Sequence, residues 1–265
     1  MSELLMRDAA PFGDEVWAAI DGMVVDVLQK TLVGRKVLDM VGPLGWGVDQ
    51  APLFEFESDG VAMAEVSGYL QLQELQEEFM LKARHLAMSD QTPFKLDLGA
   101  VAIAATRLAY QEDAMILNGL MEQAELFDDL GDWGEPNGPF SAIARVIAKF
   151  EEAGVGGRYG VAGPYTMILS PMMYARLASL MYGQGFGRRE VDMVESLLGG
   201  GIYTTTRMPD GKALLLSPQP WNMDIVVGQD AVTACLGNEG IDHLFRLFET
   251  VALRVKRPAA ICVLS

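Results

Sequence analysis

Apolar residues recur at helical spacing in three long segments of the chain. Residues 13–31 carry a regular apolar stripe with acidic residues off it, which predicts an amphipathic helix. Residues 98–127 keep the same period for longer and predict the longest helix of the chain, with Asp97 as its N-cap. A third helix is expected from Ser141, as N-cap, to Gly154. The stripe of the first helix comprises Val16, Trp17, Ile20, Val24, Val27, Leu28 and Thr31.

Alternating polar and apolar residues over positions 46–79 predict a ribbon of strands. Asp59 and Gly60 lie between two such runs and are typical of a hairpin turn. The ribbon has few apolar residues with which to build its own core, so we expect it to lean on another surface, such as a neighbouring subunit. A further short strand is expected over residues 79–86.

The segment 31–47 joins the first helix to this ribbon. It holds four glycines and a proline, so its backbone turns at fixed places. Trp46 and several aliphatic residues indicate that the segment packs against the body of the protein. Residues 36–41 are short and apolar enough for a strand. We therefore expect a fixed corner, from which the helix and the ribbon leave in different directions.

The second half of the chain is predicted to contain short helices and many strands. The break at residues 131–139, rich in glycine and proline, marks a boundary between two lobes. Ser170 and Pro171 predict a helix start, because a hydroxyl cap precedes proline at the first helical position. Helices and strands together give an α+β fold. The predicted strands cover residues 165–169, 202–206, 213–216, 223–228, 231–236, 244–255 and 260–264.

Charge and composition narrow the classes of function. The 265 residues carry a formal net charge of −16, whereas phosphate binding needs clustered Lys and Arg, so we expect no nucleic-acid partner. No apolar run approaches the roughly eighteen residues of a membrane helix, and the first residues show no secretory signal. Cys235 and Cys262 lie in apolar runs and are expected to be buried free thiols in a reducing cytoplasm, with a disulfide as the alternative.

Residues with catalytic or metal-binding chemistry do not form a recognisable site. The two histidines, His85 and His243, lie outside the spacing of known metal motifs, and no GxSxG segment is present. Adjacent carboxylates such as Glu77 and Glu78 are expected to point apart on solvated faces. The glycines of residues 154–157 follow a helix and precede a strand, the reverse of the order that cradles phosphate. We therefore predict no enzyme, no metal and no cofactor.

Five short segments carry a resemblance to one family. They are the corner (Gly34-Arg35-Lys36, Asp39, Gly42-Pro43 and Gly45-Trp46), Gly163-Pro164-Tyr165-Thr166, Gly199-Gly200 before a threonine-rich strand, Val227-Gly228-Gln229-Asp230, and the ending from Leu247-Phe248-Glu249-Thr250 to Pro258-Ala259-Ala260. In this order they resemble landmarks of the encapsulins, the shell proteins of bacterial and archaeal nanocompartments. The similarity covers about residues 4–264, is weakest at 53–76, and points to the linocin-type branch that binds cargo peptides.

The resemblance implies the major-capsid fold of tailed bacteriophages, of the Hong Kong phage type. Such a chain has an N-terminal helix, an extended loop, a peripheral domain that contains a long spine helix, and an axial domain. The parts would be the N-terminal helix and corner (1–46), the extended loop (47–79), the peripheral domain with the spine helix (80–130), the axial domain (131–224) and further peripheral strands (225–265).

The resemblance also implies a function. Encapsulin subunits close into icosahedral shells around a cargo enzyme, such as a ferritin-like protein or a peroxidase. The modest length and short extended loop favour the smallest shell class. The cargo carries a short targeting peptide that docks inside the shell, in a groove between the N-terminal helix and nearby strands. By position, this cargo-peptide groove would involve Leu28, Leu32, Arg35, Asp39, Asp230 and Val232.

Two segments depart from the family pattern. The loop that would surround the fivefold pore is rich in glycine where relatives often carry His or Tyr. We therefore expect a flexible pore with Arg188 and Arg189 near its mouth, which admits anions or small polar solutes. Arg84 and His85 stand near the place where some relatives carry an aromatic residue implicated in flavin binding, so no flavin is predicted. The pore loop comprises Gly183, Gln184, Gly185, Phe186, Gly187 and Arg188.

Two other functions compete with this interpretation. A phage or prophage major capsid protein shares the fold, but such proteins often carry a long scaffolding segment before the first helix, and here the helix begins almost at once. A protease or bacteriocin activity has been attached to shell proteins of this kind. That activity lacks support in the sequence, because no catalytic triad or metal signature is present.

Overall fold

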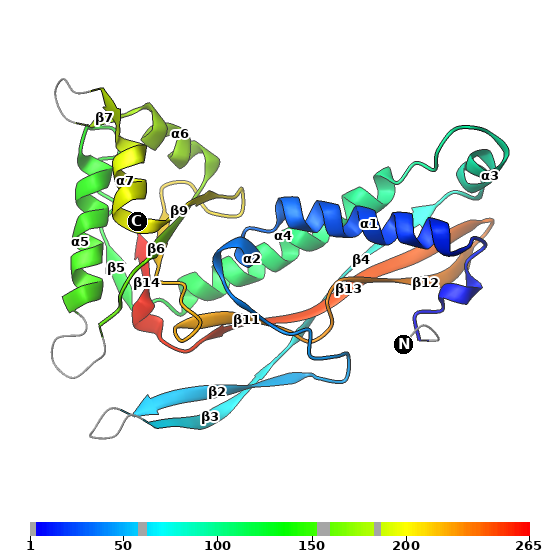
Figure 1. The fold of residues 1–265 in the computed structure, drawn as a ribbon, viewed down its shortest axis with the longest axis horizontal. Coiled ribbons are helices and arrows are strands. Elements are labelled where there is room, and N and C mark those ends of the chain that lie inside the picture. The colour runs from blue at the N-terminus through cyan, green and yellow to red at the C-terminus, as the bar shows by residue number, and fades with distance from the viewer. Residues whose placement is uncertain (1–3, 58–62, 153–159, 183–186) are drawn as a thin grey trace.

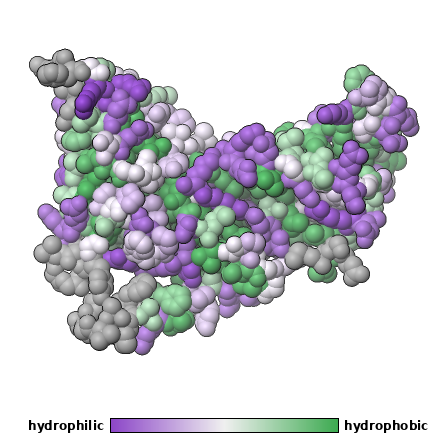
Figure 2. All heavy atoms as spheres, viewed as in Figure 1, coloured by the Kyte–Doolittle hydropathy of each residue, from purple (hydrophilic) through white to green (hydrophobic). Residues whose placement is uncertain are grey.

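The computed structural model describes residues 4–57, 63–152, 160–182 and 187–265 of the chain. The chain forms two lobes, each built on a five-stranded sheet, and a two-stranded hairpin that projects from the body (Figure 1). The outline is concave between the two lobes along one edge of the molecule (Figure 2). The mixture of helices and strands confirms the predicted α+β class.

The first lobe packs two helices on a sheet. Helix α1 (Asp14–Thr31) lies along α4 (Gly99–Glu122), and both cover the sheet (Figure 1). Trp17, Ile20 and Val24 of the predicted stripe are buried against α4 and strand residues, which confirms the amphipathic helix. The sheet comprises β1 (Met40–Val41), β11 (Met223–Val227), β13 (Asp242–Val255), β12 (Val232–Glu239) and β4 (Gln73–Leu81), the last paired with β13.

Helix α4 connects the cores of the two lobes. Val101 and Leu108 belong to the core of the first lobe, whereas Ile116 and Leu120 are packed with residues of the second. This explains why α4 has ten buried residues, more than any other described helix. The helix ends at Glu122, five residues before the predicted end, because the next residues pair as a strand with the C-terminal strand of the chain.

The second lobe surrounds a sheet whose central strands are fully buried. Ser170 Oγ accepts a hydrogen bond of 3.1 Å from the amide of Met173, which confirms the predicted helix start. Its helices are α5 (Gly138–Glu152), α6 (Pro171–Ser179) and α7 (Glu190–Leu198). Its strands, in sheet order, are β5 (Leu126–Asp128), β14 (Ile261–Leu264), β10 (Ala213–Leu216), β6 (Tyr165–Leu169) and β9 (Gly199–Thr204).

Strands β2 (Gln50–Glu57) and β3 (Met63–Gln71) form the predicted antiparallel hairpin. Its turn at Asp59 and Gly60 lies outside the described residues. The hairpin extends away from both lobes (Figure 1), and in the described part of the chain its two strands pair only with each other. At its base Ala51 is buried against Val226 and Ala252 of the first sheet, but Val66 and Tyr69 are 52% and 68% exposed and have little cover from their own chain.

Three local predictions are wrong. Residues 36–41 are not one strand, because α2 (Gly34–Val37) forms first and only β1 is extended. The strand expected over 79–86 stops with β4, and α3 (Ala83–Gln91) follows, held at its start by the carboxylate of Asp242. Ser141 lies inside α5 rather than at its cap, because the buried carboxylate of Glu190 accepts the amides of residues 137 and 140 instead. Gly154 lies outside the described residues.

In the described residues no helix is long and apolar enough to cross a membrane.

Strands β5 and β14 pair in the second sheet, although the predicted domain boundaries assign their residues to the peripheral domain. The remaining elements are η1 (Arg7–Ala9), β7 (Met181–Tyr182), β8 (Arg188–Arg189) and η2 (Pro258–Ala260).

Candidate binding site around Arg35

The corner after α1 is fixed to the middle of α4. Asp113 accepts hydrogen bonds from the amides of Val33 and Gly34, at 2.8–3.1 Å. These amides begin α2, where a carboxylate is favourable. Gly34 allows the close approach, since a Cβ there would lie 2.6 Å from Ile116 Cδ1. Burial raises the pKa of Asp113, and the two backbone amides oppose that shift.

One guanidinium binds three carboxylates at this corner. Arg35 of α2 pairs side-on with Glu112 of α4, from Nε to Oε1 and from Nη2 to Oε2, at 2.8 Å each. Its Nη2 also donates to Glu249 Oε2 of β13 at 2.7 Å, and its Nη1 donates to Asp230 Oδ1 at 2.8 Å. Glu112 and Glu249 are fully buried, whereas the Asp230 side chain is 52% exposed. Solvent therefore reaches this cluster at Asp230.

The environment of the cluster shifts the pKa of Arg35 and that of Glu249. Burial lowers the pKa of Arg35, but its bonds and proximity to Glu112 and Glu249 outweigh that effect and raise it, so the guanidinium stays charged. Burial, followed by the negative charge of Glu112, raises the pKa of Glu249 well above its ordinary value. Glu249 Oε1 is buried and has no hydrogen-bond partner among the described residues. A proton on this carboxyl relieves its repulsion with Glu112.

The structure places the predicted groove residues in different environments. Arg35 and Asp230 are in direct contact, as described above. Leu28 and Leu32 are 6% and 2% exposed in the core between α1 and α4, so in this conformation they present little surface. The Asp39 side chain is exposed, and its carbonyl accepts from the amide of Ile225.

Val232 lies beside a small apolar cluster near the N-terminus. It is half-buried and packs with Leu5 and Phe248, and the ring of Trp46 lies 5.1 Å from that of Phe248. This cluster adjoins the loop that carries Asp230. The predicted set thus contains one polar contact open to solvent, with apolar residues beside it.

Glu112 and Glu249 were missed as members of the site. Each lies at a sequence position whose pattern predicts a buried side chain. Glu112 falls on the apolar stripe of the long predicted helix, and Glu249 falls inside the long predicted strand 244–255. A charged residue in a buried pattern needs a partner, but the sequence does not show that both partners are the same arginine.

The residues considered for chemistry are dispersed. No group of three or more His, Cys, Asp or Glu in the described part of the chain is arranged to hold a metal ion. His85 is exposed on α3, and His243 Nδ1 lies 2.7 Å from Asn238 Oδ1. Cys235 and Cys262 are buried and free, as predicted, and burial raises the pKa of Cys262 to about 12. Such a thiol is unreactive at neutral pH.

The predicted pore loop is described only at its end. Gly183, Gln184, Gly185 and Phe186 lie outside the described residues. Gly187 has φ +66°, and Arg188 of β8 is exposed with its Nη1 3.9 Å from the sulfur of Met193.

Comparison with solved structures defines the class of protein. The chain is similar to the capsid protein of Myoviridae phage XM1, with a TM-score of 0.58, 11% identity, and coverage of 87% of this chain and 90% of that one. It is more similar to a virus-like particle from Pyrococcus furiosus, with a TM-score of 0.81, 22% identity, and coverage of 95% and 100%. The fold is therefore that of the tailed-phage capsid proteins, as predicted.

The family follows from sequence. Residues 1–252 match the family described as encapsulating protein for peroxidase, and the chain belongs to this family. A type 1 encapsulin shell protein, EncA of Myxococcus xanthus, is 31% identical over an alignment of 287 positions, which covers all of this chain and 97% of the relative. A diheme-cytochrome-encapsulin shell fusion protein of Kuenenia stuttgartiensis is 28% identical over 95% of this chain and 73% of the relative. These relatives are named as shell proteins, which favours the encapsulin interpretation over a phage capsid or a protease.

Proposed function

We propose that this chain is the subunit of a closed icosahedral shell, of the smallest size class, that encloses a cargo enzyme in the cytoplasm. The observation that carries the proposal is the family match over residues 1–252 on a capsid fold. The projecting hairpin supports it, because Val66 and Tyr69 need cover that a neighbouring copy supplies. Two buried free thiols suit a reducing compartment.

The cargo enzyme would be held by a targeting peptide at the corner around Arg35 and Asp230. The family description names a peroxidase as the enclosed protein, and the Kuenenia relative carries a cytochrome fused to its shell domain. A peroxidase or a ferritin-like protein is the proposed cargo. Each apolar anchor of such a peptide contributes roughly 1.5–3 kcal/mol before ordering costs. Many weak sites on one shell retain a multimeric cargo through avidity.

The predicted domain division and pore belong to the same proposal. The first sheet with α1 and α4 would be the peripheral domain, and the lobe with α5, α6 and α7 would be the axial domain. Arg188, the exposed last residue of the pore loop, would lie near the fivefold mouth and favour the entry of anions. These assignments rest on the resemblance to encapsulins and on the arrangement of the lobes.

Electron microscopy of the chain expressed alone tests the proposal. Uniform hollow particles in negative stain are the expected result, and their diameter gives the size class. A monodisperse monomer or small oligomer would contradict self-assembly. Cargo binding is tested next, by co-expression with a fluorescent protein fused to the C-terminal peptide of a candidate peroxidase or ferritin-like cargo enzyme. Co-purification of fluorescence with particles is expected, with a fusion that lacks the peptide as the control.

A further inference from the structure

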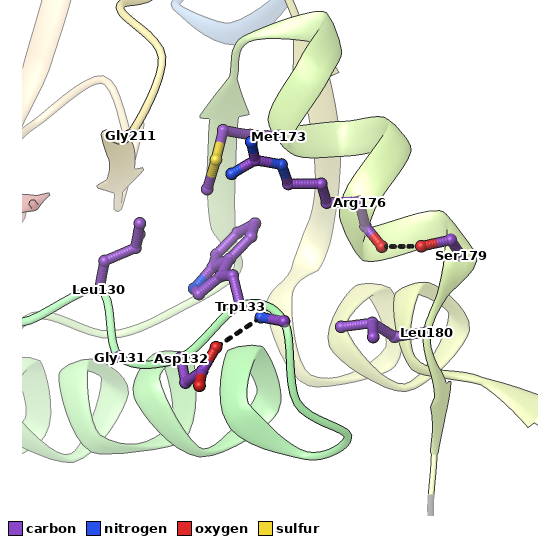
Figure 3. A pocket seen from close by; sticks show the side chains of 10 residues that line it. Leu130, Gly131, Asp132, Trp133, Met173, Arg176, Ser179, Leu180 and Gly211 are labelled. Atoms are coloured by element: carbon purple, nitrogen blue, oxygen red, sulfur yellow. Dashed lines mark hydrogen bonds between the residues drawn. The ribbon is translucent and has the colours of Figure 1, made fainter.

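The pocket in the second lobe does not select one class of ligand. It has a volume of about 490 Å³ and lies between the loop 130–134, helix α6 and the turn at Gly211 (Figure 3). Its lining carries one arginine, Arg176, and one aspartate, Asp132, which already accepts a hydrogen bond from the amide of Gly134. The first lobe, in contrast, has a pocket that a side chain of the same protein fills.

Strand β12 lies at an edge of the first sheet, beside this pocket. Among the described residues its ladder partner is β13 alone, so the sheet does not use the backbone groups on its other side. One of them, the amide of Cys235, donates a hydrogen bond of 2.9 Å to the carbonyl of Leu5. The residues before α1 thus cover part of an edge to which a peptide could add.

The side chain of Leu5 fills the pocket. It is 5% exposed and packs with Ala234 of β12 and Phe248 of β13. Leu4, its neighbour in sequence, is 71% exposed, so only one of the two leucines is held. The Leu5 pocket therefore accepts a single apolar side chain from a segment whose backbone bonds to β12.

The Leu5 pocket adjoins the proposed cargo site. Val232, a predicted groove residue, packs against it, and Asp230 lies two residues before Val232. Phe248 of the pocket precedes Glu249, which binds Arg35. Because neighbouring residues of a strand point to opposite faces, the pocket and the Arg35 cluster lie on the two faces of one sheet. A peptide along the edge of β12 would place successive side chains on these two faces.

The segment is held firmly at Arg7 and lightly at Leu5. Arg7 pairs with Asp21 of α1 through two bonds of 2.7 and 2.8 Å, and its guanidinium carbon lies 4.5 Å from the centre of the Trp17 ring. Leu5 has one backbone bond to β12 among the described residues, and Met6 has φ +50°, which residues other than glycine rarely adopt. A rotation at Met6 would release Leu5 and leave Arg7 in place.

We propose that Leu5 is an internal ligand of the cargo site, which an apolar side chain of the targeting peptide displaces when the peptide bonds to the edge of β12. The inference rests on the proposed function and adds an autoinhibitory contact to it. A peptide fits better than a small molecule, because the pocket lies beside open backbone groups and Leu5 already uses both. Cargo competes with Leu5, so its apparent association constant is the intrinsic one multiplied by the fraction of open subunits.

Thiol accessibility tests the displacement. Leu5→Cys shells are prepared empty, or loaded with the fluorescent protein fused to the C-terminal peptide of a candidate cargo enzyme, and are treated with a small thiol reagent. We expect labelling at position 5 to be several-fold faster in the loaded shells. Leu4→Cys is the matched control, because position 4 is exposed already and should react at one rate in both. Wild-type shells give the background from the buried Cys235 and Cys262. Equal rates at position 5 would overturn the displacement.

Cargo loading gives an independent measure. Leu5→Ser removes the apolar side chain from the pocket, so shells co-expressed with the same fusion should hold several-fold more of it per subunit than wild-type shells. Leu4→Ser makes the same change on a side chain outside the pocket and should load as wild type. Loading in Leu5→Ser that is unchanged or reduced would contradict an internal ligand.

The proposed function and the internal ligand fail in different ways. A wild-type chain that forms no shells, or shells that take up no more of the fusion than of the fluorescent protein without the peptide, would contradict the proposed function. Wild-type shells that load the fusion, together with one labelling rate in Leu5→Cys and equal loading in Leu5→Ser and Leu4→Ser, would contradict the internal ligand alone.

Discussion

Arg35 Nη2 donates a hydrogen bond of 2.7 Å to Glu249 Oε2, across 214 residues of sequence. The bond joins the corner after α1 to the long strand β13. Glu249 is fully buried, and the same nitrogen also binds the buried Glu112 at 2.8 Å. One guanidinium therefore binds two carboxyl groups that water does not reach. The position of the corner depends on this arginine.

Arg35→Ala should destabilise the folded chain strongly. Removal of one partner from a buried ion pair leaves charge without compensation, and the expected loss is about 3–5 kcal/mol of unfolding free energy. Urea unfolding followed by tryptophan fluorescence measures it. Lys30→Ala is the matched control, because Lys30 forms an exposed pair with Asp26 at helical spacing, worth about 0.5 kcal/mol or less. A loss in Arg35→Ala no larger than in the control would show that the cluster does not hold the corner.

Glu249→Gln should make stability less dependent on pH. A carboxyl with a raised pKa holds its proton more tightly in the folded chain, so its contribution is complete below pH 4.5, its ordinary pKa, and is lost as the pH rises toward the raised value. The wild-type chain should therefore lose this contribution steadily as the pH rises above about 4.5, toward the raised pKa of Glu249. Glutamine does not titrate, so the difference in unfolding free energy between the two chains should change over that range. A constant difference would mean that Glu249 is ionised throughout.

The sequence predicted the fold well where burial alone decides the structure. The stripe through Trp17 and Ile20 became a helix because it packs one apolar face on a core. The continuous apolar run at residues 213–216 became a strand that is buried on both faces. The wrong predictions lie where a polar group that is far away in sequence decides where a helix begins. Asp113 starts α2, Asp242 starts α3, and Glu190 replaces the expected cap of α5, and none of these carboxylates is near its target in sequence.

The candidate site shows the same limit. The resemblance to encapsulins supplied Arg35 and Asp230, which do meet in space. It also supplied Leu28 and Leu32, which the periodicity of α1 places in the core. Glu112 and Glu249 could be suspected from their buried patterns, but only the packing of α2 between α4 and β13 brings them to one guanidinium. Long-range geometry of this kind does not follow from local sequence.

Gly42→Ala should disrupt the corner from its other side. Gly42 has φ +129°, which side chains rarely adopt, and an added Cβ would overlap the carbonyl oxygen of Val227. We expect a loss of about 1–3 kcal/mol in urea unfolding. Gly47→Ala is the matched control in the same corner, because nothing lies within 4 Å of its added Cβ. Its unfolding free energy should stay within about 1 kcal/mol of wild type. Equal effects at both glycines would mean that the corner is not tightly packed at Gly42.

Arg188→Glu should slow the entry of anions into shells if this residue lies at the proposed pore. Reversal of an exposed charge near a narrow opening changes the local potential for anions, and much less for neutral solutes. The rate at which an anionic quencher reaches an enclosed fluorescent cargo measures this, with a neutral quencher alongside. Arg84→Glu makes the same change on α3, away from the loop, and serves as the control. Identical anion quenching in wild type and Arg188→Glu would remove Arg188 from the pore.

Asp230→Asn should separate cargo binding from folding. Asp230 is the exposed carboxylate of the cluster, and its bond to Arg35 is half open to solvent, so its loss should cost about 1 kcal/mol or less of stability. If the targeting peptide docks at this corner, the loss of a charged hydrogen-bonding group should lower its affinity by roughly tenfold or more. The ratio of cargo to shell after co-expression measures loading, with Asp26→Asn on the outer face of α1 as the control. Normal loading in Asp230→Asn shells would place the peptide elsewhere, whereas loss of both loading and stability would show that Asp230 acts through the fold.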